Sequence, residues 1–351
     1  MDSRIVLTIN GNVSDLLTSS ASISVYEKAG QATEFQLRLP IDIVDSDFPM
    51  LLENDLAPGN EVMILASSDD VSECLVKGQI FGHEVQYLHG GVGSSVRVFG
   101  GDSRFTMQRE NKCVQWADVT DSEVVSSIVA QYGMIPEVSA TDSRHLTEKH
   151  SLIQRNTDDF FIDMLAKRNG FLFWVGSDDS GIETAYFQPP QLQGDAHFDL
   201  VINMDEANLD EFTLKWDCLR ATEFSANQLD LNSLELIEAN ASEADLEFLG
   251  NTMLSQVINQ QANFHSLAPA NDTGCLTSLS KGMLNDSQWF IHGKCVTSAN
   301  RLGRILRANK LANIRGLGSR HSGYYYIVSV THTIDSTRHL MNVEVVRNAW
   351  S

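Results

Sequence analysis

Apolar and polar residues alternate along much of the first hundred residues of the chain. From Glu34 to Leu39 every second residue is apolar, and this period of two is typical of a half-buried strand. Further short strands are predicted at residues 4–10, 21–26, 61–66, 74–86 and 94–99, with turn residues such as Pro58-Gly59-Asn60 between them. Short strands at regular spacing predict a small β-barrel or sandwich.

The spacing of apolar residues becomes helical after Trp116. A capping box formed by Thr120 and Glu123 opens a predicted helix that ends at Gly133. A second helix is predicted over residues 157–169, and its apolar stripe is expected in the core: Phe160, Phe161, Met164 and Leu165. Residues 171–175 and 183–187 predict a hairpin that completes an α/β segment.

The rest of the chain returns to strands, with helices among them. Strands are predicted at residues 210–216, 220–230, 289–296, 305–314, 324–334 and 339–347. One helix is predicted at 242–258, with Leu246, Leu249, Met253, Leu254 and Val257 on one face, and a shorter helix at 274–284. The order of these elements predicts an α+β fold, mostly β, in which a helical insertion splits a second β domain.

Composition and charge exclude several classes of protein. The chain has 351 residues with 46 acidic and 25 basic side chains, a formal net charge of −21. Such a surface repels phosphate, so specific nucleic-acid binding is not expected. No apolar run reaches the roughly 18 to 20 residues of a membrane span, and the first residues lack the features of a secretion leader. Five scattered cysteines indicate reduced thiols in a chain that folds in a cytoplasm.

Few groups stand at catalytic or metal-binding spacing. The glycine-rich stretches at 90–93 and 316–321 lack the neighbours of phosphate and dinucleotide loops, so we expect turns there. Two histidine pairs, His145 with His150 and His332 with His339, fall short of the ligands that a zinc site needs. Three acid pairs lie in predicted turns or helix starts: Asp69-Asp70, Asp158-Asp159 and Asp178-Asp179. We predict no catalytic, cofactor-binding or metal-binding residue, and only a carboxylate pair that meets in the fold is left open.

Several ordered motifs resemble one family. The strongest is the stretch from His150 to Trp174, which contains Gln-Arg-Asn-Thr-Asp-Asp-Phe-Phe, later Leu-Ala-Lys-Arg-Asn-Gly, and then the aromatic strand Phe-Leu-Phe-Trp. Shorter motifs stand at 58–62, 76–80, 98–102 and 323–334 and at Arg347-Asn348. Together they resemble the hub family of contractile tails, which comprises phage late-control D proteins and the amino-terminal part of VgrG spike proteins. One departure is Ala308-Asn309-Lys310, where the family has Pro-Gly.

The resemblance implies two tube-type β-barrels in one chain. The first would span residues 1–112, and the second would span 206–240 plus 288–351. An α/β domain would occupy 113–205 and a helical insertion 241–287. Since the motifs run to the end of the printed sequence, no spike or toxin domain is expected after them. Arg155 and Asn156 would orient a helix or contact a neighbour, and Tyr324, Tyr325 and Tyr326 would alternate sides of a strand. His332 is expected to be a hydrogen-bonded structural residue.

The implied function is structural. Three copies would form a homotrimer that adapts a hexameric tail tube to a trimeric central spike in the baseplate of a phage tail or an injection particle. The implied partners are the tail tube protein ring, the central spike protein and other baseplate proteins, with no cofactor and no membrane insertion. The protein would be made in the bacterial cytoplasm. The alternatives are a tail-associated enzyme that degrades the cell wall and a carbohydrate-binding β protein.

Overall fold

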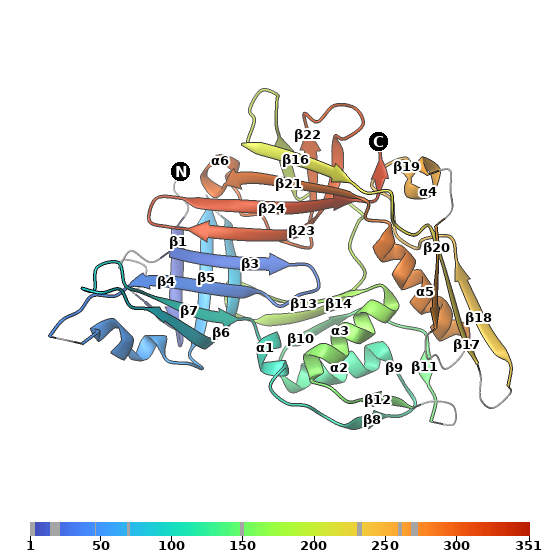
Figure 1. Ribbon diagram of the computed structural model, residues 1–351, viewed down its shortest axis with the longest axis horizontal. Helices are drawn as coiled ribbons and strands as arrows, with labels where there is room; N and C mark the ends of the chain where they lie inside the picture. The colour runs from blue at the N-terminus through green and yellow to red at the C-terminus, as the bar shows by residue number, and fades with distance from the viewer. Residues whose placement is uncertain are drawn as a thin grey trace.

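A computed structural model describes residues 4–14, 22–45, 47–68, 71–147, 151–229, 234–258, 262–267 and 273–351. Its largest element is one 13-stranded sheet in the order β16-β21-β24-β23-β3-β4-β7-β6-β5-β1-β2, from which β22 and β15 branch at β23. In Figure 1 this sheet runs from β16 at the top to β6 below. The predicted α+β, mostly β fold is confirmed. No helix in the described ranges has the length and apolar character needed to span a bilayer.

The first half of the sheet surrounds its own apolar core. Its strands are β1 (Arg4–Ile9), β2 (Asn12–Val13), β3 (Ser22–Lys28), β4 (Glu34–Pro40), β5 (Glu61–Ser68), β6 (Val71–Gln86) and β7 (Ser95–Gly101). Two short 3-10 helices, η2 (Pro49–Leu52) and η3 (Asn54–Leu56), precede β5. As predicted, Phe35, Leu37 and Leu39 of β4 are buried, and they pack with Ile23 and Val25 of β3. Ile305 and Ile334 from the far end of the chain join this core.

The second half of the sheet surrounds a second core. Its strands are β15 (Phe198–Val201), β16 (Glu211–Trp216), β21 (Ile291–Ser298), β22 (Leu311–Arg315), β23 (Gly323–Ile334) and β24 (His339–Arg347), and α6 (Ala299–Leu302) follows β21. Phe290, Leu306, Ile314, Tyr325 and Val345 are among the residues of this core. The strand predicted at 305–314 begins only at Leu311, because Asn309 has a left-handed φ of 62° and turns the chain. Asn309 therefore supplies the backbone conformation for which the resembling family uses glycine.

The two halves repeat one arrangement of four strands. The spatial order β3-β4-β7-β6 matches the order β16-β21-β24-β23, and in each set the last two strands are reversed relative to the sequence. Both sets have a β-bulge at the same place, between Ile80 and Gly82 in β6 and between Ile327 and Ser329 in β23. Antiparallel pairing of β23 with β3 joins the two sets into one sheet.

The chain between the two halves forms an α/β unit. Its elements are α1 (Arg104–Met107), β8 (Val114–Trp116), β9 (Val119–Thr120), α2 (Asp121–Gln131), β10 (Ile135–Val138), β11 (Arg144–His145), β12 (Leu152–Gln154), α3 (Asp158–Asn169), β13 (Leu172–Ser177) and β14 (Glu183–Gln188). Helices α2 and α3 lie beside the sheet β10-β14-β13 (Figure 1). The capping box at Thr120 and the left-handed Gly170 after α3 are confirmed.

The predicted stripe of α3 is partly wrong. Phe161 and Leu165 are buried as expected, but Phe160 is 57% exposed and Met164 is 39% exposed. The helix instead buries Phe161, Ile162, Leu165 and Ala166, so its apolar face is rotated by about one residue, or roughly 100°. The pattern of four apolar residues fits either face, and the position of α2 and β13 decides between them.

A smaller unit of three strands and one helix lies beside the second half. Strands β17 (Glu223–Leu229), β18 (Leu236–Ala241) and β20 (Asn263–Leu267) form a separate sheet in the order β18-β17-β20, and α5 (Thr273–Ser287) packs against it. Residues 206–240 were predicted to lie in the second barrel; within that range β16 pairs in the large sheet, whereas β17 and β18 pair in the separate sheet. Alternation predicted the strand at β17 and missed β18 and β20, and alternation does not identify the partner strand.

The helix predicted at residues 242–258 is wrong. Only α4 (Leu254–Val257) is helical there, next to β19 (Thr252–Met253), which pairs with β25 (Ala349–Trp350). The backbone of the preceding segment bonds to side chains instead of to itself. Asn348 accepts a bond from the Leu249 N–H at 2.9 Å, and Arg347 donates to the Leu249 carbonyl at 2.6 and 2.9 Å. Because these bonds replace helical ones, the apolar periodicity of the segment does not produce a helix.

Candidate functional site

The strongest sequence motif forms a buried ionic cluster at the start of α3. Asp158 is 1% exposed and accepts bonds from Lys112 at 2.5 Å, from the Tyr132 hydroxyl at 2.6 Å and from Gln154 at 2.6 Å. These bonds fix α3 against the segment before β8, the end of α2 and β12. Burial, followed by the hydrogen bond to Asp158, raises the pKa of Tyr132 and keeps its hydroxyl protonated as a donor.

Asp159 makes a second set of contacts toward the first half of the sheet. It accepts bonds from Arg104 Nε at 2.5 Å and from Gln108 at 2.8 Å. Arg104 is buried as well, and its guanidinium also donates to the Phe173 carbonyl at 2.6 Å and lies over the Phe173 ring. The paired acids were predicted only as favourable helix-start residues. Their partners, distant in sequence, show that both carboxylates also hold elements together.

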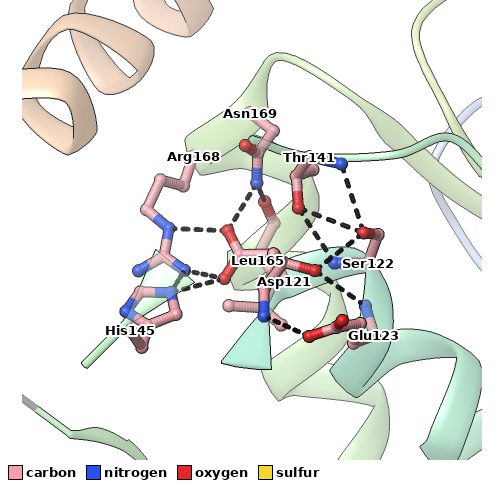
Figure 2. A network of polar contacts seen from close by, with 9 residues as sticks. Asp121, Ser122, Glu123, Thr141, His145, Leu165, Arg168 and Asn169 are labelled. Atoms are coloured by element: carbon pink, nitrogen blue, oxygen red, sulfur yellow. Dashed lines mark hydrogen bonds and ion pairs between the residues drawn. The ribbon is translucent and has the colours of Figure 1, made fainter. Parts of the chain in front are cut away.

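A third acid, Asp121, connects α2 with the end of α3 (Figure 2). Its carboxylate contacts His145 Nε2 at 2.8 Å, Asn169 Nδ2 at 2.7 Å and the Arg168 guanidinium. Burial acts to raise the pKa of Asp121, but the His145 hydrogen bond and the Arg168 charge outweigh burial and lower it. The resulting negative charge lies at the first turn of α2, where the helix dipole favours it. The motif residues Arg168 and Asn169 thus brace two helices.

Arg155 and Asn156, which were predicted either to orient a helix or to contact a neighbour, take different positions. Arg155 is exposed between β12 and α3, whereas Asn156 accepts the Lys112 N–H with its carbonyl at 3.3 Å. Asn156 therefore contributes to the local turn. Arg155 is exposed, and its two predicted roles, orienting the helix or contacting a neighbour, stay predictions.

The described histidines lie in pairs and clusters without a third metal-ligating side chain. His145 belongs to the Asp121 cluster, and His150 lies outside the described residues. His332 Nδ1 and His339 Nε2 are 2.9 Å apart, and both residues are buried, so the predicted structural role of His332 is confirmed. His332 Nε2 is buried with no hydrogen-bond partner in the described part of the chain. The described residues contain no cluster of three His, Cys, Asp or Glu side chains that could hold a metal ion.

The remaining candidate groups have structural positions. Asp178 accepts bonds from the Ser180 and Ile182 N–H groups in the β13–β14 turn, and Asp69-Asp70 lies outside the described residues. The five cysteines form no disulfide bond with one another, and burial raises the pKa of Cys74 and that of Cys295 to about 12. Thiols with such pKa values are protonated at neutral pH and are poor nucleophiles.

The tyrosines of β23 are divided between two cores. Tyr325 lies in the core of the second half, whereas Tyr326 packs with Trp289 and Leu311 on the opposite face. Tyr324 is exposed. Both faces of β23 are therefore covered, which matches its place in the middle of the large sheet.

An ion cluster fastens the β3–β23 junction. Arg307 donates to Glu27 at 2.6 Å, to Glu73 at 3.2 Å and to the Cys74 carbonyl at 2.6 Å. Glu27 is buried and also accepts the Ala308 N–H at 3.1 Å. Residues of β3, β6 and the turn before β22 thereby meet at one point, so the two halves of the chain form a single body.

A cleft with a volume of about 1120 Å³ lies between α3 and α5. Its lining mixes exposed aromatic side chains, including Phe160 and Phe264, with Asp163 and Asp286. Two further charged groups of the lining, Arg104 and Asp159, are bonded to each other. This lining has the character of a surface groove and lacks an activated nucleophile.

Several strand edges of the large sheet lack a neighbour among the described strands, and two of them are six residues long. The outer edge of β16 is one, because β16 pairs only with β21. The other is the end of β6 at residues 81–86. There β7 pairs along one side of β6, whereas the pairing of β6 with β5 on the other side stops at Gln79 of β6. Exposed side chains flank both edges, with Phe81 and Trp216 each 51% exposed. Open edges of this kind are templates for pairing with another chain.

The fold resembles that of solved tail proteins. A 43 kDa tail protein of prophage MuSo2 from Shewanella oneidensis aligns with a TM-score of 0.70 and 14% identity over 100% of both chains. A tail protein from Neisseria meningitidis aligns with a TM-score of 0.69 and 9% identity over 99% of this chain and 97% of that one. The E. coli c3393 protein, described as a component of the type VI secretion system, gives 0.57 and 9% over 99% and 77%.

These likenesses show the fold, since all the identities are low. No curated protein matches the sequence. A family model also matches, and its description differs from the late-control D and VgrG names that the motifs suggested. That model is described as the Alg8 N-terminal domain and matches residues 3–336, so the chain belongs to the Alg8 N-terminal domain family.

Proposed function

We propose that this protein is a structural hub of a contractile tail or a related injection particle. It forms a homotrimer that joins a hexameric tube to a trimeric central spike. The observation that carries the proposal is the repeat of one four-strand order in the two halves of a continuous sheet. A chain with two equivalent units can supply six units in a closed ring of three.

Further support comes from the fold and from the character of the buried charges. Two of the solved proteins that share this fold are described as tail proteins and one as a component of a secretion system. The motif acids Asp121, Asp158 and Asp159 are used to fix helices, which fits a building block better than a catalyst. The proposed units are two tube-type barrels, the α/β unit and the insertion that carries α5.

The mass in solution tests the trimer. We expect sedimentation at micromolar concentration to give three times the mass of the chain, and negative-stain images to show three-fold rings. Adding a tail tube protein from the same particle should place a six-fold ring on one face. A monomer at every concentration, with and without that partner, would contradict the proposal.

A peptidoglycan-release assay separates the hub from the enzyme alternative, and a glycan array separates it from the carbohydrate-binding alternative. We expect the purified chain to release no more dye-labelled peptidoglycan than a heat-denatured control, and to bind no glycan above background.

A further inference from the structure

We propose that residues 83–87 of one copy, at the end of β6 and one residue beyond it, pair antiparallel with residues 212–216 of β16 in a second copy, in a fixed register. This pairing rests on the proposed homotrimer and specifies how its subunits meet. The partner is a second copy of this chain, because the pairing it requires already exists once inside the chain.

The internal template is the pairing of β23 with β3. Upstream of its bulge β23 pairs with β22, and downstream it pairs with β3, from Ser329 opposite Lys28 to Ile334 opposite Ile23. Strand β6 repeats the first part of this arrangement, since upstream of its bulge it pairs with β5. Downstream, residues 81–86 have no strand on that side within the described ranges. The equivalent of β3 is thus missing beside β6.

The missing strand is identified by the same repeat. Strand β3 begins the first set of four strands, and β16 begins the second, where its outer edge is open. The open edge of β16 spans six residues, Glu211–Trp216, and the open end of β6 at 81–86 has the same length. Each subunit would therefore offer one edge of each kind, and in a closed ring of three copies all of these edges would be paired.

The register follows by tracing equivalent residues through the ladders. The first residues after the two bulges, Gly82 and Ser329, are equivalent, so Val85 corresponds to His332. From Val25, the ladder of the first set passes through Phe35 and Gly100 to Ile80. From Leu214, the ladder of the second set passes through Gly293 and Val345 to Ile327. Val25 and Leu214 are therefore equivalent.

Inside the chain His332 lies opposite Val25, so the template places Val85 opposite Leu214 of the second copy. The same register places Tyr87 opposite Phe212 and Glu84 opposite Lys215. Apolar residues then face apolar residues and an acid faces a base, although side-chain chemistry played no part in deriving the register. Such directly opposed pairs stabilise antiparallel sheets.

Slipped registers lose this match. A shift by one residue places Val85 opposite Thr213 or Lys215, and it moves every side chain of the strand to the other face. Glu84 is already paired with Arg97 of β7, so Lys215 would extend an alternating row of charges across three strands. Tyr87, which is 59% exposed, would be covered by Phe212.

Cysteine cross-linking tests the register. The variant carries Glu84→Cys and Lys215→Cys in a background with Cys113→Ser and Cys218→Ser, because these two thiols are not buried. Directly opposed residues lie about 4.5 to 5.5 Å apart between Cα atoms, within the range of a disulfide. We expect mild oxidation to convert most of the chain to a covalent trimer on a non-reducing gel. A mixture of the two single-cysteine variants should stop at a dimer.

The matched control moves one cysteine by two residues on the same face. Glu84→Cys with Thr213→Cys separates the pair by about 7 to 8 Å, and we expect at least tenfold less cross-linking. A charge reversal gives a second test: Glu84→Lys and Lys215→Glu should each weaken the trimer about two- to fivefold per interface, and the double reversal should restore it.

The outcomes separate the two proposals. A trimer by sedimentation that cross-links no better through 84–215 than through 84–213 would overturn the strand pairing and leave the hub function standing. A chain that is monomeric at every concentration and with the tube protein present would overturn the hub function and the pairing together. Covalent trimers through 84–215 alone support both.

Discussion

At the scale of single residues, Arg307 is the most consequential side chain outside the cores. Its guanidinium bonds Glu27, Glu73 and a carbonyl of β6 at the β3–β23 junction. We expect Arg307→Met to lower the free energy of unfolding by about 3 to 5 kcal/mol, because it leaves the buried Glu27 carboxylate without a partner charge. Urea unfolding followed by tryptophan fluorescence measures the change.

Two controls distinguish a lost partner from a lost side chain. Glu27→Gln combined with Arg307→Met removes both charges and should recover most of the loss. Arg301→Met breaks an exposed ion pair with Asp210 and should cost less than about 1 kcal/mol. A loss below about 1 kcal/mol for Arg307→Met itself would show that the junction does not depend on this residue.

Sequence reasoning predicted local residue roles and missed distant ones. The Thr120 cap and Gly170 were predicted because their partners lie within four residues. The roles of Gln154, Lys112 and Arg104 were missed, since each bonds an acid through a contact that only the fold creates. A buried glutamine four residues before an acid pair is a weak signal, because polar residues precede many helices.

At the scale of elements, the segment before β19 is held open by the end of β24. We expect Asn348→Ala to remove two bonds, to the Leu249 N–H and to the Glu247 carbonyl, and to lower stability by about 1 to 3 kcal/mol. Hydrogen exchange at Leu249 should quicken at least tenfold. Asn342→Ala, at an exposed position of the same strand, should leave that amide unchanged. Unaltered exchange in Asn348→Ala would contradict this account.

Element prediction failed where side chains replaced backbone partners or where two faces were equally apolar. The segment 242–258 has helical periodicity, but Arg347 and Asn348 take its hydrogen bonds. Helix α3 carries apolar residues on adjacent faces, so its length was predicted and its orientation was not. The longer strands of the large sheet were predicted, because alternation depends only on having one buried face, whereas shorter strands such as β8, β10, β15, β18 and β20 were missed.

At the scale of the whole molecule, the buried His332–His339 pair makes the sheet sensitive to acid. Burial lowers the pKa of His339 to about 4 and that of His332 well below 6.5, so both are neutral in the fold. Above about pH 6.5 both histidines are neutral in the folded chain and in the unfolded chain. Below it the unfolded chain takes up protons that the folded chain refuses, so stability falls, by up to about 1.4 kcal/mol per pH unit for each histidine.

Thermal unfolding between pH 7 and pH 4 measures this effect. His332→Asn with His339→Gln keeps an amide near each bonding nitrogen and removes the titration, so its melting temperature should fall less steeply over that range. Replacement of the solvent-exposed His83 by Gln is the control and should retain the wild-type slope. Equal slopes for the double variant and the wild type would exclude the pair as the cause.

The repeat of the two halves could not be predicted from the sequence. Equivalent positions hold unlike residues, such as Phe35 and Gly293 or Val85 and His332, because each half fills its core in its own way. The insertion that carries α5 also separates β16 from β21, whereas β3 and β4 are joined by a short turn. The apolar pattern of the sequence shows that strands exist. Only the pairing of those strands in the fold shows that one arrangement of four strands occurs twice.

The β3–β23 junction also constrains the order of folding during synthesis. Glu27 and Arg307 are 280 residues apart in the chain. At bacterial synthesis rates of about 5 to 20 residues per second, the edge of β3 stays unpaired for roughly 14 to 56 seconds until its partner strand has been synthesised. Throughout that interval Ile23 and Val25 lie beside an unpaired edge, so nascent chains on one messenger are exposed to premature pairing with one another. Slow translation or crowded polysomes would therefore favour misassembly at this strand above all others.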